Sequence, residues 1–190
     1  YSVENMAADV ISIMDDAGID KAHMVGTSTG GAIIQILCVD NPERVQSAGI
    51  ICAWDKSDHF FIRQFEMRKR ILLSLGTEAL MLVTSTTLND PKYFTEHYDE
   101  ILEKEAALLA NAGPPEVDAE RIDAIIAHDQ KDRLSQITVP TLVIGSKNDV
   151  VCPPYFSEHI AEAIPGAELK IYEDGGHFFY LVYDEEFNED

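Results

Sequence analysis

The sequence predicts an α/β protein in which a mostly parallel sheet carries flanking helices and one large helical insertion. Short apolar segments alternate with helical segments in the first and last parts of the chain, whereas residues 58–131 contain no convincing strand. Strands that alternate with helices form parallel sheets with right-handed crossovers. The length of 190 residues suits one domain with a substantial core.

Helix and strand signals alternate over the first 54 residues. Ser2 can cap the opening helix, and Gly18 can end it. The last strand of this part is apolar without alternation, which is typical of a strand buried on both faces. The expected elements are a helix over 2–16, a strand over 23–26, a helix over 30–39 and a strand over 47–54.

The rest of the chain divides into a helical stretch and a return to alternation. Helical patterns separated by Gly and Pro indicate about four helices between residues 58 and 131. The expected elements after them are a strand over 141–145, a helix over 154–163 and a strand over 168–173. We therefore predict a core formed by residues 1–54 and 132–190, with a helical cap over 55–131.

The composition excludes several classes of partner. The chain has 34 acidic against 14 basic side chains, a net charge of −20, so nucleic acids and anionic membranes are not expected to bind. No apolar run is long enough to span a bilayer. The cysteines have no metal-like spacing, and a cytoplasmic location is expected. Cys38 and Cys52 are predicted to be core residues, and Cys152 to lie nearer the solvent.

A G-x-S-x-G pentapeptide, residues 26–30, lies between a predicted strand and a predicted helix. In that context the pattern predicts a tight, strained turn that exposes the hydroxyl of Ser28 at the amino end of the helix. Side chains at Gly26 and Gly30 are expected to clash with neighbouring backbone, and Gly31 to allow close packing. The N–H of Thr29 is expected to point at a developing oxyanion.

A serine hydroxyl needs a base, and His177 is the best candidate among six histidines. It follows the last predicted strand, and two glycines free its loop to bring the imidazole over the sheet edge. The other histidines are expected to be structural or exposed. His23 is placed in a strand beside the core, and the expected surface residues are His59, His97, His128 and His159.

The base needs a carboxylate that orients it, and Asp149 is the preferred candidate. It follows the predicted strand that ends at Gly145. The chain order is also the expected one, because a serine on a strand–turn–helix is followed first by the acid, Asp149, and then by the base, His177. Asp55, directly after an earlier strand, is the alternative acid. The sequence therefore predicts a Ser-His-Asp triad.

These motifs together resemble the α/β-hydrolase superfamily over the whole chain. The segments that carry the resemblance are residues 25–31, 41–45, 137–145 and 174–177. The helical stretch more weakly resembles aminoacrylate hydrolases and 3-oxoadipate enol-lactonases. The resemblance implies the triad, the Thr29 amide and a small acyl or lactone substrate. It also implies that further strands, with a second oxyanion donor, precede the first helix in family members.

The expected function is hydrolysis of a small ester, lactone or related acyl compound through an acyl-enzyme, with no cofactor and no metal. The candidate lining residues of the pocket are Trp54, Phe60, Phe61 and Phe178. Two alternatives stay open. One is a ligand-binding protein that keeps the fold, and the other is carbon–carbon bond hydrolysis or perhydrolysis with the same triad. Whether the chain forms a homo-oligomer is also open.

Overall fold

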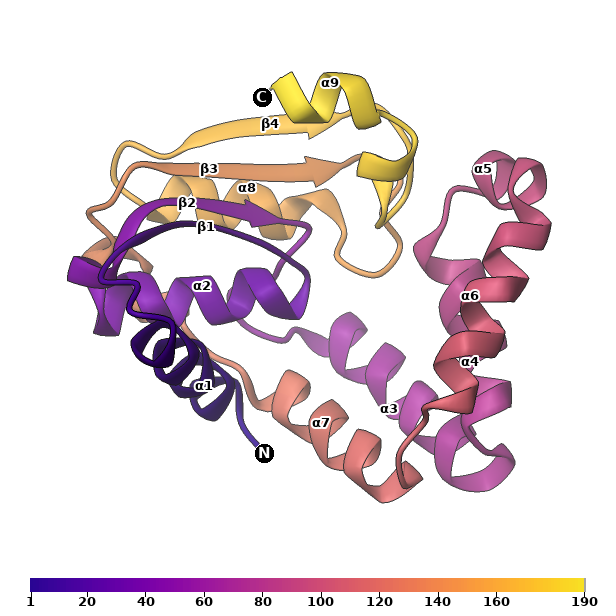
Figure 1. The fold of residues 1–190 in the computed structure, drawn as a ribbon. Coiled ribbons are helices and arrows are strands. Elements are labelled where there is room, and N and C mark those ends of the chain that lie inside the picture. Colours follow the sequence, from indigo (N-terminus) through magenta and orange to yellow (C-terminus); the bar gives the residue numbers. More distant parts are fainter. Residues whose placement is uncertain (190) are drawn as a thin grey trace.

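The computed structural model describes residues 1–189 and shows one sheet of four parallel strands in the order β1-β2-β3-β4. The strands are β1 (Ala22–Thr27), β2 (Val45–Ile51), β3 (Thr141–Ser146) and β4 (Glu168–Tyr172). Their registers pair Thr27 with Ile51, Ile51 with Ile144, and Ser146 with Tyr172. The carboxyl ends of the strands therefore lie along one edge, as the arrowheads in Figure 1 show.

Helices cover the two faces of the sheet unequally. On one face lie α1 (Val3–Asp16), α2 (Thr29–Asp40) and α8 (Pro154–Ala163) (Figure 1). On the other face, η3 (Phe179–Leu181) and α9 (Asp184–Glu189) cover part of the sheet. Two short 3-10 helices, η1 (Pro42–Arg44) and η2 (Lys131–Gln136), precede β2 and β3.

Five helices fill the stretch between β2 and β3, where about four were expected. They are α3 (His59–Leu75), α4 (Thr77–Leu88), α5 (Pro91–Glu96), α6 (Tyr98–Ala110) and α7 (Pro115–Ala127). The extra one arises because the stretch over 93–110, which was expected to be one of the four helices, breaks at His97. The backbone of His97 leaves the helical region at φ −112° and ψ 25°. These inserted helices gather beyond the carboxyl ends of the strands (Figure 1).

The sequence signals for the ends of the core helices are confirmed. Ser2 Oγ accepts a hydrogen bond from the Asn5 N–H at 3.1 Å, and Gly18 follows α1 with a φ of 67°. The strand expected over 47–54 instead ends at Ile51, because Cys52 has a φ of 44° and cannot continue it.

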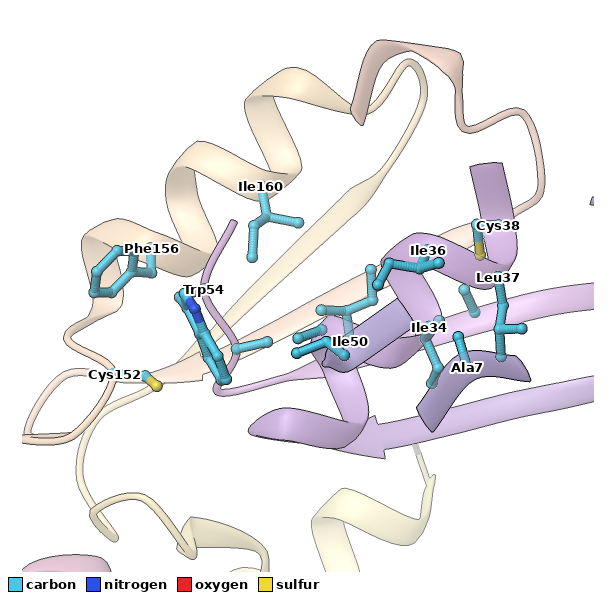
Figure 2. Packing of buried hydrophobic residues seen from close by; sticks show 14 of the residues in the cluster. Ala7, Ile34, Ile36, Leu37, Cys38, Ile50, Trp54, Cys152, Phe156 and Ile160 are labelled. Carbon is cyan, nitrogen blue, oxygen red and sulfur yellow. The ribbon is translucent and has the colours of Figure 1, made fainter. Parts of the chain in front are cut away.

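The main core lies between the sheet and α1, α2 and α8, and it continues into the inserted helices. Figure 2 shows Ile34, Ile36 and Leu37 on α2 in the same cluster as Ile50 and Ala7, with Trp54 lying toward Phe156. A smaller cluster on the opposite face joins Ile51, Ile144 and Tyr172 to Phe179.

Several burial expectations were wrong. Cys152 is 1% exposed and His128 is 3% exposed, whereas both were expected nearer the solvent. His23 lies on the exposed side of β1 and contacts Ser47. Val25 in β1 is 70% exposed, so the described part of the sheet is not covered on both faces at β1.

Candidate active site

The turn between β1 and α2 holds Ser28 in a conformation that few residues adopt. Its φ is 57° and its ψ is −119°, and its backbone N–H donates to the carbonyl of Ile51 at 2.8 Å. Strain of this kind persists only where the surroundings fix it. The turn therefore keeps Ser28 at the end of β1, beside the end of β2.

Gly26 and Gly31 make this turn possible. A Cβ on Gly26 would lie 2.5 Å from the backbone of Gly30, and one on Gly31 would lie 2.6 Å from Ala53. The expectation for Gly30 was wrong, because a Cβ there would meet nothing within 4 Å. Gly30 contributes the backbone that excludes a side chain at Gly26.

Thr29 is the first residue of α2, and the first N–H groups of a helix have no partner within that helix. Within residues 1–189, no acceptor outside the helix receives a hydrogen bond from the Thr29 N–H. The same helix end carries the positive end of the helix dipole, which favours negative charge there. An oxygen that gains negative charge beside Ser28 would therefore meet a free donor.

His177 and Asp149 form a buried pair at the same edge of the sheet. His177 is 1% exposed, and its Nδ1 lies 2.7 Å from Asp149 Oδ2. Asp149 Oδ1 accepts hydrogen bonds from the N–H groups of Val151 and Cys152, at 2.7 and 2.9 Å. Both carboxylate oxygens are thus satisfied, and the imidazole is held through one nitrogen.

The loop that carries His177 is fixed to the loop that carries Asp149. Gly176 donates its N–H to Asn148 Oδ1 at 2.8 Å, and Ser146 Oγ donates to the carbonyl of Asp174 at 2.8 Å. Gly175 has a φ of 98°, and a Cβ there would lie 2.7 Å from Phe179. The two glycines therefore let the chain turn sharply enough to bring the imidazole to the carboxylate.

The structure thus brings Asp149 and His177 together and places Ser28 at the same strand edge. Within the described residues, no hydrogen bond joins Ser28 to His177. Catalytic hydrogen bonds are often long in structures without a ligand and tighten when substrate binds.

The alternative acid, Asp55, is 4% exposed and lies instead beside a cavity of about 390 Å³ that Lys131 and His159 also line. Burial raises the pKa of Asp55.

The expected lining residues fall into different environments. Trp54 and Phe61 have no exposed surface, and their rings pack 4.7 Å apart within the core. Phe60 is 52% exposed and borders a cavity of about 330 Å³ beside α4. Phe178 lies next to His177, and its N–H donates to the carbonyl of Leu88 at 3.0 Å. A role in substrate binding stays a prediction for all four.

Sequence reasoning did not assign Cys52 to the site. Its sulfur, a His177 nitrogen and an Asp149 oxygen all lie within 4.8 Å of one another, and all three residues are buried. Burial, with the negative charge of Asp149, raises the pKa of the Cys52 thiol far above its ordinary value. The residue follows an apolar strand, so its sequence pattern resembled that of a core cysteine.

Comparison with known proteins agrees with this architecture. The family described as alpha/beta hydrolase fold matches residues 1–183. The chain belongs to the α/β-hydrolase family.

Two relatives illustrate the similarity within this α/β-hydrolase family. A protein of Azorhizobium caulinodans named "Putative carbamate hydrolase RutD" is 37% identical over 188 residues, which cover 99% of this chain and 71% of the relative. A protein of the same name from Caulobacter segnis is 31% identical over 189 residues, which cover 100% of this chain and 71% of the relative.

Solved structures show the same fold. The enol-lactonase from Burkholderia xenovorans LB400 has a TM-score of 0.90 at 22% identity, over 100% of this chain and 71% of that one. Est816, described as an N-acyl homoserine lactone degrading enzyme, has a TM-score of 0.82 at 28% identity, over 100% of this chain and 73% of that one.

Within residues 1–189, no helix combines the length and apolarity needed to cross a membrane.

Proposed function

We propose that this α/β-hydrolase acts on a small ester, lactone or carbamate through a serine nucleophile and an acyl-enzyme intermediate. The buried hydrogen bond between His177 Nδ1 and Asp149 Oδ2 carries the proposal. That bond fixes the imidazole and leaves its other nitrogen to accept a proton. The strained turn at Ser28 supports it, because such a turn presents a hydroxyl at a helix amino end.

In the proposed mechanism His177 Nε2 takes the proton of Ser28 as the hydroxyl attacks the acyl carbon. Asp149 stabilises the imidazolium, and the Thr29 N–H donates to the oxyanion. The leaving alcohol takes the proton from His177. A water molecule then attacks the acyl-enzyme while His177 takes its proton. As the bond from Ser28 Oγ to the acyl carbon breaks, His177 gives that proton to Oγ, and the acid is released.

The names of the relatives suggest which acyl compounds the substrate panel should contain. Two relatives above 30% identity carry the name carbamate hydrolase, and Est816 at 28% identity degrades a lactone. The inserted helices stand beyond the strand edge that carries Ser28, Asp149 and His177, and we propose that they cap the substrate. A small substrate suits such a covered site.

A serine-directed phosphonate probe and a substrate panel test the proposal. The panel contains short esters, lactones and carbamate esters, each assayed with the wild type and with Ser28→Ala. We expect the probe to label Ser28, and Ser28→Ala to lower kcat by at least about 10³-fold. Equal hydrolysis by both proteins, or labelling at another residue, would contradict the proposal. Ligand binding without turnover or labelling would favour a binding protein.

A further inference from the structure

Arg68 of α3 is a buried cation that has no ion-pair partner. The residue is 6% exposed, and within residues 1–189 no carboxylate lies within ion-pairing distance of it. One terminal nitrogen donates to Gln64 Oε1 at 3.2 Å and to Thr87 Oγ1 at 2.8 Å, whereas Nε finds no hydrogen-bond partner among the described residues. Burial of an unpaired charge is costly. A chain with 34 acidic residues could easily pair this arginine, so its isolation calls for an explanation.

The charge of Arg68 acts on the triad carboxylate without touching it. Burial lowers the pKa of Arg68, and the nearby thiol of Cys152 and carboxylate of Asp149 act in the opposite direction. The oxygens of Asp149 already accept from the N–H groups of Val151 and Cys152 and contact His177. Arg68 therefore adds a positive potential at Asp149 and does not compete for its oxygens.

Gln64, one turn earlier on α3, supplies a mechanical link to the same loop. Its Nε2 donates to the carbonyls of Val150 and Val151, both at 3.3 Å. The N–H of Val151 in turn holds Asp149 Oδ1 at 2.7 Å. A single amide therefore connects Arg68 to the backbone that orients the carboxylate.

We infer that Arg68 and Gln64 are positioning residues that tie the inserted helices to the Asp149–His177 pair. This inference rests on the proposed function. Gln64 fixes the loop from residue 149 to 152 through the carbonyls of Val150 and Val151, and Arg68 in turn holds Gln64. The reacting proton still moves only between Ser28 and His177, and Arg68 touches neither of them.

The other titratable groups that face this pair are two thiols. Cys52 faces it from the end of β2, and Cys152 from the loop before α8. Burial raises the pKa of both thiols, so both are uncharged near neutral pH. Arg68 is therefore the group whose removal changes the charge around the pair.

The test compares the pH dependence of kcat/KM in four proteins: the wild type, Arg68→Met, Arg68→Lys and Arg63→Met. Arg68→Met removes the buried positive charge near the Asp149–His177 pair. We expect Arg68→Met to move the acid limb upward by about half a pH unit or more. Arg68→Lys keeps the positive charge, so its acid limb should lie at the same pH as that of the wild type. Arg63→Met removes an exposed cation from the same helix and should leave the limb in place.

A second measurement does not depend on turnover. The proton between His177 and Asp149 should give a low-field NMR resonance, recorded in Ser28→Ala with and without Arg68→Met or Gln64→Leu. We expect both second substitutions to shift or broaden it. An unchanged resonance and an unchanged acid limb in a folded Arg68→Met protein would overturn the inference. Absence of probe labelling and turnover in the wild type would instead refute the proposed function, while the resonance would still test Arg68.

Discussion

At the scale of single residues, each oxygen of Asp149 has a separate task. Oδ1 accepts two backbone N–H groups, which fix the carboxylate in the loop, and Oδ2 faces the imidazole. A neutral amide at this position would keep much of the shape. It would, however, lose the charge that stabilises an imidazolium and would favour the wrong histidine tautomer.

Asp149→Asn should therefore abolish most activity while the protein stays folded. We expect a fall in kcat of about 10³- to 10⁴-fold, the loss that removal of the acid causes in serine triads. The control is Asp55→Asn, which changes the alternative acid and should keep activity within a few-fold of the wild type. Steady-state kinetics on the best substrate of the panel, with circular dichroism as a folding check, would measure both. A larger loss in Asp55→Asn than in Asp149→Asn would reverse the assignment.

At the scale of elements, the crossing of β1 and α2 depends on contacts that only glycine permits. The backbone of Gly30 and the side chain of Ala53 occupy the space where side chains of Gly26 and Gly31 would lie. The strained Ser28 turn is therefore a consequence of close packing between a helix and two strands.

Gly26→Ala should destabilise the protein, because its methyl group would lie 2.5 Å from backbone atoms that cannot move independently. We expect the free energy of unfolding to fall by about 2 kcal/mol or more, as in overpacked cores. Gly113→Ala is the matched control, since a Cβ there meets nothing within 4 Å. Urea unfolding of both variants gives the comparison, and equal stabilities would show that the turn can relax.

The sequence predicted these elements well where local signals decide them. Ser2 and Gly18 marked the ends of α1, and the strand–turn–helix context of Ser28 predicted the turn. Long-range packing decides what was missed. Arg68 lies three residues after Phe65 and four before Leu72, on the buried stripe of α3, although arginine is mostly an exposed residue type. Cys52 lies near Asp149 because β2 and β3 are neighbours in the sheet, and His177 reaches them from the loop after β4, the neighbour of β3.

At the scale of the whole molecule, the buried His128 couples stability to pH. Neither of its ring nitrogens has a hydrogen-bond partner within residues 1–189, and its ring packs edge-on against Trp54. Burial lowers its pKa from 6.5 to about 4. Between pH 6.5 and pH 4, His128 is protonated in the unfolded chain and neutral in the folded chain. The free energy of unfolding therefore falls as the pH drops from 6.5 toward 4.

His128→Leu should remove this part of the pH dependence. The histidine makes the wild type lose about 3 kcal/mol between pH 6.5 and pH 4, and the leucine variant should lack that loss. The measurement is the difference in unfolding free energy between the two proteins at several pH values. A difference that stays constant across this window would show that His128 is not the responsible group.

The burial of every cysteine has a practical consequence. Cys38, Cys52 and Cys152 are free thiols with 0–1% exposure, and burial raises the pKa of Cys38 to about 12. Thiol reagents attack thiolates, so the native fold should shield all three sulfurs from alkylation. Their labelling rates would then report how often α2, the end of β2 and the loop before α8 open. The chain thus carries built-in probes of local unfolding at a helix, at a strand end and beside Asp149.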